Sequence, residues 1–132
     1  MRIFRIIAVA LLVTCLPNAL FAASPSGFGS FSKYVPGTDK QVPIDSATIA
    51  DNVVFHAQIT AEDGEHKLTF NVYDGNGREV MTAETVLVVR GGRGARAMSY
   101  GFDRVRDVPG VWWYVAALDG QVVVSNSLQV SK

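Results

Sequence analysis

The chain has 132 residues, and its 12 basic and 12 acidic side chains give no formal net charge at pH 7. This length is enough for one folded domain and too short for two well-packed ones. The balanced charge argues against bulk attraction to nucleic acid or to an anionic membrane surface.

The first 22 residues have the three parts of a secretory signal peptide. Arg2 and Arg5 form a charged start, an apolar stretch follows, and Ala22-Ala23-Ser24 is a small-residue exit. The apolar stretch, at about 15 residues, is short for a membrane-spanning helix, which needs roughly 20. We therefore predict cleavage after Ala22. We expect a bacterial protein that is either periplasmic or secreted and that has no transmembrane segment after cleavage.

Cys15 is the only cysteine of the chain and lies within this predicted signal peptide. An alternative interpretation is a lipoprotein, in which Cys15 is lipidated and kept as the anchored first residue. In the simpler case, the mature chain of residues 23–132 has no cysteine and therefore no disulfide. Its stability must then come from its core.

Residues 23–38 are rich in glycine, serine and proline, a composition typical of a flexible leader. Three aromatic residues, Phe28, Phe31 and Tyr34, are interspersed in it. Part of the leader could therefore lie on the domain, as an edge strand or as a cover over an apolar face. Residues 39–132 are expected to form the folded domain.

Within residues 39–132, apolar residues recur at every second position, and turn signals arrive every eight to twelve residues. This spacing is typical of an all-β sandwich. Short turns between the strands favour two antiparallel sheets packed face to face. The seven strands that we expect cover residues 40–44, 53–60, 66–74, 79–90, 96–102, 111–118 and 121–130.

The best-defined element is a hairpin near the C-terminus, which begins at Pro109-Gly110 and turns at Asp119-Gly120. The spacing of Gly110, Trp112, Tyr114 and the Asp-Gly turn resembles the penultimate strand of immunoglobulin-like and fibronectin-III-like modules. The resemblance implies a seven-stranded antiparallel immunoglobulin-like β-sandwich. The chain lacks the Cys…Trp…Cys spacing of antibody domains, and the resemblance implies no activity.

Both faces of the strand 111–118 are apolar. A strand with one face in water would instead alternate apolar and polar residues. If Trp112 faces the core, Trp113 faces outward. A tryptophan buries on the order of 200 Å², so an uncovered Trp113 forgoes about 5 kcal/mol at ~25 cal/mol per Å². Either the leader or another molecule is expected to cover it. The residues that we predict to bind a partner on this side are Val111, Trp113, Val115, Val123, Val86 and Val88.

No pattern in the mature chain predicts catalysis, a cofactor or a metal site. No serine stands in a Gly-x-Ser-x-Gly motif, and His56 and His66 are interpreted as surface residues. Met98 falls on the inward phase of its strand, where a methionine fills core space rather than binding copper. The acidic residues show no calcium-loop spacing. We therefore expect no enzyme.

The segment Arg90-Gly91-Gly92-Arg93-Gly94-Ala95-Arg96 has two interpretations. Its glycines and the guanidinium groups of Arg90, Arg93 and Arg96 could bind an anionic ligand or glycan. Alternatively, it is a hairpin loop whose arginines keep a sheet edge soluble. The phosphate-binding Gly-Lys-Ser/Thr pattern is not present.

Together these patterns favour an exported, non-enzymatic binding module. We expect it to engage a protein partner through the Trp113 side or through an open strand edge, either of which could also join two copies of the chain. The alternative is binding of a small anionic ligand or glycan by the Arg90–Arg96 loop.

Overall fold

The structure is a computed structural model that describes residues 24–132. The predicted signal peptide and Cys15 lie outside the described residues. Nine strands account for most of the described chain, and their bounds are as follows: β1 (Ser26–Tyr34), β2 (Gln41–Ile44), β3 (Ser46–Thr48), β4 (Asn52–Thr60), β5 (Gly64–Tyr73), β6 (Glu79–Val89), β7 (Arg93–Gly101), β8 (Gly110–Leu118) and β9 (Gln121–Ser131).

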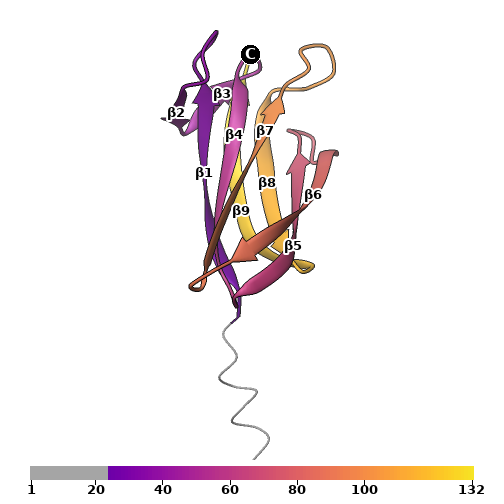
Figure 1. Cartoon of the computed structure of the whole chain (residues 1–132). Helices are drawn as coiled ribbons and strands as arrows, with labels where there is room; N and C mark the ends of the chain where they lie inside the picture. The colour runs from indigo at the N-terminus through magenta and orange to yellow at the C-terminus, as the bar shows by residue number, and fades with distance from the viewer. Residues whose placement is uncertain (1–23) are drawn as a thin grey trace, which may run out of the picture.

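The strands form two sheets that pack face to face (Figure 1). One sheet has the order β2-β1-β4-β7, and the other has the order β3-β9-β8-β5-β6. All pairs are antiparallel except β3 with β9, which is parallel. The predicted all-β sandwich is confirmed, but it has nine strands rather than seven. The two strands that lie outside the seven predicted ranges are β1 and β3, although an edge strand was one interpretation of part of residues 23–38.

Strand β1 corrects the prediction of a flexible leader over residues 23–38. It pairs with β4 on one side and with β2 on the other, so it lies inside the four-stranded sheet. Its glycines serve close packing: a β-carbon on Gly29 would lie 2.8 Å from Val124 Cγ1 and 2.6 Å from Asn126 Oδ1 of β9. Phe31 is buried, with its ring centroid 5.0 Å from that of Tyr114.

The core is centred on aromatic residues from both sheets. On β8, the side chains of Trp112, Tyr114, Ala116 and Leu118 are buried, as their alternation predicts. The Trp112 indole donates a hydrogen bond from Nε1 to the Val108 carbonyl at 2.8 Å, which satisfies its polar atom. Burial raises the pKa of Tyr114, whose hydroxyl has no hydrogen-bond partner among the described residues.

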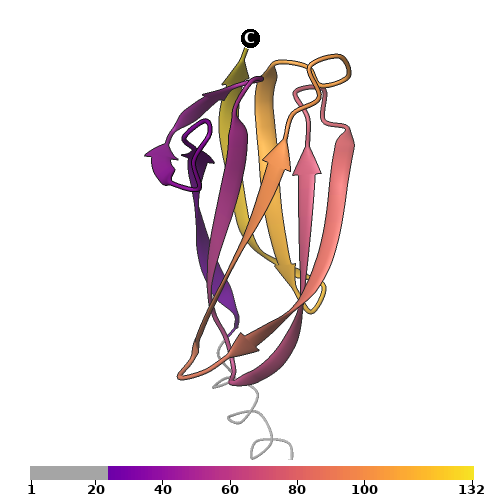
Figure 2. The same ribbon diagram turned by 45° about the horizontal axis from the view of Figure 1, so that its top comes forward.

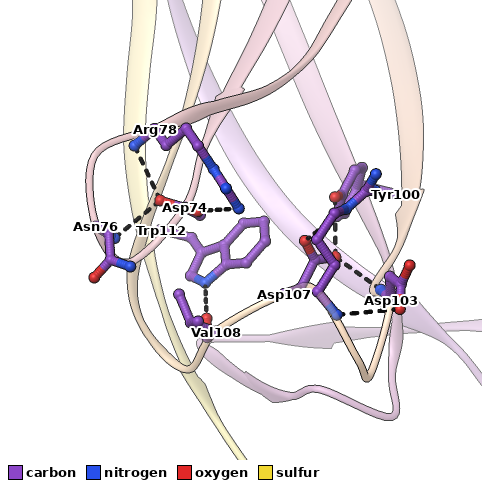
Figure 3. Close-up of polar contacts among 9 residues, drawn as sticks. Asp74, Asn76, Arg78, Tyr100, Asp103, Asp107, Val108 and Trp112 are labelled. Carbon is purple, nitrogen blue, oxygen red and sulfur yellow. Dashed lines mark hydrogen bonds and ion pairs between the residues drawn. The ribbon is translucent and has the colours of Figure 1, made fainter.

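Two buried aspartates organise the loops at the end of the sandwich beside Trp112 (Figure 3). Asp74 Oδ1 accepts hydrogen bonds from the backbone N–H groups of Asn76 and Arg78, both at 2.9 Å. Asp107 Oδ2 accepts from the Tyr100 hydroxyl at 3.0 Å and from the backbone N–H of Asp103. Burial and the Asp107 carboxylate raise the pKa of Tyr100 to about 12. These carboxylates fix the β5–β6 and β7–β8 turns.

At the opposite end, His66 ties the β4–β5 loop to the β8–β9 turn. Its Nδ1 lies 2.6 Å from Asp119 Oδ2, and its Nε2 lies 2.7 Å from the Glu62 carbonyl oxygen. Both partners only accept hydrogen bonds, so both ring nitrogens must carry protons. The hydrogen bond to Asp119 is the main cause that raises the pKa of His66, and the same contact lowers the pKa of Asp119.

We predict that this contact makes stability depend on pH. A histidine whose pKa rises on folding adds stability that is fully present below its unfolded pKa of about 6.5, and this stability disappears as the pH rises through the folded value. Urea unfolding of wild type and His66→Gln is expected to differ most near about pH 5.5 and least near about pH 8.5. A difference that is constant over this range would show that folding does not raise the pKa of His66.

Candidate binding face

Trp113 lies on the outer face of the five-stranded sheet, in the middle of the strand order. It pairs with Tyr73 of β5 on one side and with Ser127 of β9 on the other. Trp113 is 45% exposed, and Val111, two residues before it, is 46% exposed. Val115 follows on the same face and is half-buried. We call Val111, Trp113, Val115 and the adjacent Tyr73 the Trp113 face.

Residues 24–38 do not cover the Trp113 face, because β1 belongs to the opposite sheet (Figure 1). The aromatic residues of this segment are placed elsewhere: Phe31 packs in the core, and Phe28 is 60% exposed on the outer face of the four-stranded sheet. The exposed part of Trp113 amounts to about 100 Å², so covering it gains roughly 2.5 kcal/mol.

Val123, which we predicted on this face, is placed differently. A bulge in the β8–β9 pairing sets Val124 opposite Ala116 and Val122 opposite Ala117. Val123 is the extra residue and packs against the core, whereas Val122 is 59% exposed. A bulge shifts the alternation by one position. Strict alternation therefore placed Val123 on the outer face, where the structure has Val122.

Val86 and Val88 point outward, as expected, but they do not join the Trp113 face. They lie on the edge strand β6, opposite Lys67 and Glu65. The nearest member of the Trp113 face, Val115, pairs with Asn71, which is four residues from Lys67 along β5, a distance of about 14 Å at ~3.4 Å per residue. Polar Thr69 and Glu84 lie between. The predicted continuous apolar face is therefore two separate patches.

A polar cluster lies beside the aromatic part of the Trp113 face. Asn71 Nδ2 donates to Glu79 Oε1 at 2.6 Å and to Thr82 Oγ1 at 3.2 Å, and the Thr82 hydroxyl also donates to Glu79 Oε1. The hydrogen bonds from Thr82 and Asn71 to Glu79 lower the pKa of Glu79, and the bond from Thr82 has the larger effect. Sequence reasoning missed this cluster, although the outward phase of Asn71 and Tyr73 on their strand was a usable signal.

The Arg90–Arg93 turn is a two-residue hairpin turn, in which Gly91 and Gly92 have φ values of 61° and 79°. Its backbone donors are already engaged: the N–H of Gly92 donates to Asp63 Oδ1 at 2.7 Å, and the N–H of Gly91 donates to Asp63 Oδ2 at 3.2 Å. The chain's own carboxylate therefore occupies the place that an anionic ligand would take.

The three arginines of this segment are placed differently. Arg90 and Arg93 flank the turn, and Arg96 reaches across to β6, where Nη2 donates to the Val86 carbonyl at 3.1 Å. Strands β6 and β7 join at this turn and run apart from it (Figures 1 and 2). Arg96, on the edge strand of one sheet, therefore donates to a backbone carbonyl on the edge strand of the other sheet.

One serine and one histidine meet on the outer face of the four-stranded sheet. Ser32 Oγ donates to Gln41 Oε1 at 2.6 Å and lies 2.8 Å from His56 Nε2. Because the serine proton goes to the amide oxygen, Nε2 acts as a donor here and not as a base. Within residues 24–132, no carboxylate hydrogen-bonds to His56, and no group of three or more potential metal-ligating side chains converges.

The same outer face carries a hollow of about 630 Å³ near the start of β1. Its lining includes Phe28, Gln58 and Arg93.

The part of the chain that the structure describes has no helix long and apolar enough to cross a membrane.

Solved structures resemble the chain in fold. An immunoglobulin-like protein from Pseudomonas aeruginosa matches with a TM-score of 0.51 and 15% sequence identity, over 83% of this chain and 98% of that one. The CARDB domain of a Pyrococcus furiosus protein, in complex with di-metal ions, matches with a TM-score of 0.48 and 10% identity, over 82% and 93% of the two chains. No protein-family model and no curated protein matches.

The fold is therefore an immunoglobulin-like β-sandwich, as the hairpin motif implied. Likeness at this level of identity establishes architecture, and function must be argued from the residues of the site.

Proposed function

We propose that this chain is an exported, non-enzymatic binding module that engages a protein partner through the Trp113 face. The observation that carries the proposal is the half-exposed Trp113, held on the outer side of a strand whose inner side is fully buried. A large aromatic side chain on a rigid strand loses little conformational entropy when a partner covers it. Tryptophan is accordingly enriched among the residues that dominate protein–protein binding energy.

Anion binding at the Arg90–Arg96 loop receives less support. Asp63 satisfies the backbone donors of the turn, and Arg96 is engaged with β6. A ligand there would compete with these three intramolecular hydrogen bonds. Within residues 24–132, no hydrogen bond or ion pair involves the Trp113 side chain, so a partner at the Trp113 face has none to displace.

The test compares capture of a partner from a periplasmic extract by tagged wild type, Trp113→Ser and Phe28→Ser. We expect Trp113→Ser to lose the captured protein, because a central tryptophan contributes about 2 kcal/mol or more to such an interface. Phe28→Ser removes a comparably exposed aromatic from the opposite sheet and is expected to capture as wild type does.

Both variants must first show cooperative thermal unfolding above the temperature of the assay, so that a loss of capture reports on contact and not on folding. Capture that survives Trp113→Ser and disappears with Phe28→Ser would move the binding surface to the hollow on the four-stranded sheet.

A further inference from the structure

Glu79 carries a negative charge that no cation of the described chain neutralises within ion-pair distance. The ion pairs of the described residues join Lys33 to Asp51, Lys67 to Glu84, Arg78 to Asp74, Arg106 to Asp107 and His66 to Asp119. Arg78 is adjacent in sequence, but its guanidinium lies 3.2 Å from Asp74 Oδ2 at the buried end of the turn (Figure 3). Glu79 is left without such a partner.

The Glu79 carboxylate is also held in a fixed position. Its Oε1 atom accepts hydrogen bonds from Asn71 and Thr82, which project from neighbouring strands onto the same face. The same two bonds lower its pKa, so the group is ionised at neutral pH. A carboxylate that is held in this way can bind a cation with little further loss of side-chain freedom.

Two aromatic rings lie in the same row as this carboxylate. Trp113 on β8 pairs with Tyr73 on β5, and Tyr73 pairs with Glu79 on β6. Neighbouring strands lie about 4.8 Å apart, so the row spans roughly 10 Å. A cationic side chain laid across it could contact a ring face and a carboxylate at once, a combination that favours guanidinium and ammonium groups.

From this row we infer that the partner presents an arginine or lysine side chain to Trp113, Tyr73 and Glu79, flanked by apolar residues that cover Val111 and Val115. The inference rests on the proposed function, because it describes the partner chemistry of the same face. It adds a requirement for a positive charge on the partner, which the apolar and aromatic residues of the Trp113 face alone do not impose.

The test uses a short blocked peptide, acetyl-Val-Arg-Val-amide, and its citrulline analogue, which keeps the shape of arginine without the charge. Backbone and indole NMR shifts of wild type are followed as each peptide is added. We expect saturable shifts at Trp113, Tyr73 and Glu79 with the arginine peptide and none with the citrulline peptide. Glu79→Gln and Trp113→Ala are each expected to weaken binding by about threefold to fivefold.

The matched control is Glu84→Gln, which removes an acid from the same face of β6 that is paired with Lys67. It is expected to leave binding unchanged. Equal binding of the two peptides, no saturable shift with either, or unchanged binding by Glu79→Gln would each overturn the cationic site. None of these results would alter capture of the partner by the Trp113 face, whereas full capture by Trp113→Ser would overturn the proposed function itself.

Discussion

Replacing Trp112 with alanine is expected to lower the free energy of unfolding by about 3–5 kcal/mol, the usual cost of removing a fully buried tryptophan. The Trp112 side chain has no exposed surface, and its ring packs 4.8 Å from Phe102 and 5.7 Å from Tyr100, measured between centroids. The substitution also leaves the Val108 carbonyl without its hydrogen-bond donor. Urea unfolding at fixed pH measures the loss.

Trp113→Ala is the matched comparison, because it removes the same side chain from the next position. It is expected to lower the free energy of unfolding by about 2 kcal/mol, clearly less than Trp112→Ala does, since nearly half of the Trp113 side chain is already in contact with solvent. If the two variants were equally destabilised, Trp113 would belong to the core and the proposed binding face would not exist.

Replacing Phe31 with alanine is expected to cost about 3–5 kcal/mol as well, because Phe31 is a core residue of β1. Its ring centroid lies 5.3 Å from that of Phe55 and 5.0 Å from that of Tyr114, so its removal opens a cavity between the two sheets. The same urea unfolding experiment measures this loss.

Phe28→Ala serves as the control for Phe31→Ala, since both residues lie on β1 and only Phe31 faces the core. The control is expected to stay within about 1 kcal/mol of wild type. A flexible leader predicts that neither substitution affects unfolding, so a wild-type result for Phe31→Ala would remove β1 from the fold.

Strands β4 to β9 could be predicted because all of them are bounded by turn residues and most of them alternate apolar and polar residues. Strand β8 does not alternate, but its apolar run lies between the Pro109-Gly110 and Asp119-Gly120 turn signals. Strand β1 could not, because Gly27 and Gly29 give it the composition of a linker. Those glycines allow close contact with Val124, a residue almost 100 positions away, and composition carries no information about such a contact. Strand β3 has three residues, too few to show any period.

Alternation required that one of Trp112 and Trp113 faces outward, but the outline of the outward face did not follow from it. Bulges at Val123 and between Tyr73 and Val72 shift the pairing, and nothing local in the sequence marks either of them. The position of Val86 relative to Trp113 depends on which strands are neighbours, which alternation does not specify. The role of Asp63 was hidden for a similar reason, because it lies 28 residues before the Gly91 N–H that it accepts from.

The most direct test of the binding face is the dissociation constant of the purified partner for Trp113→Ser relative to wild type. An interface centred on Trp113 predicts weakening of about tenfold or more, the equivalent of roughly 1.4 kcal/mol or greater. Phe28→Ser is predicted to bind with the wild-type constant. An unchanged constant for a fully folded Trp113→Ser protein would contradict the account.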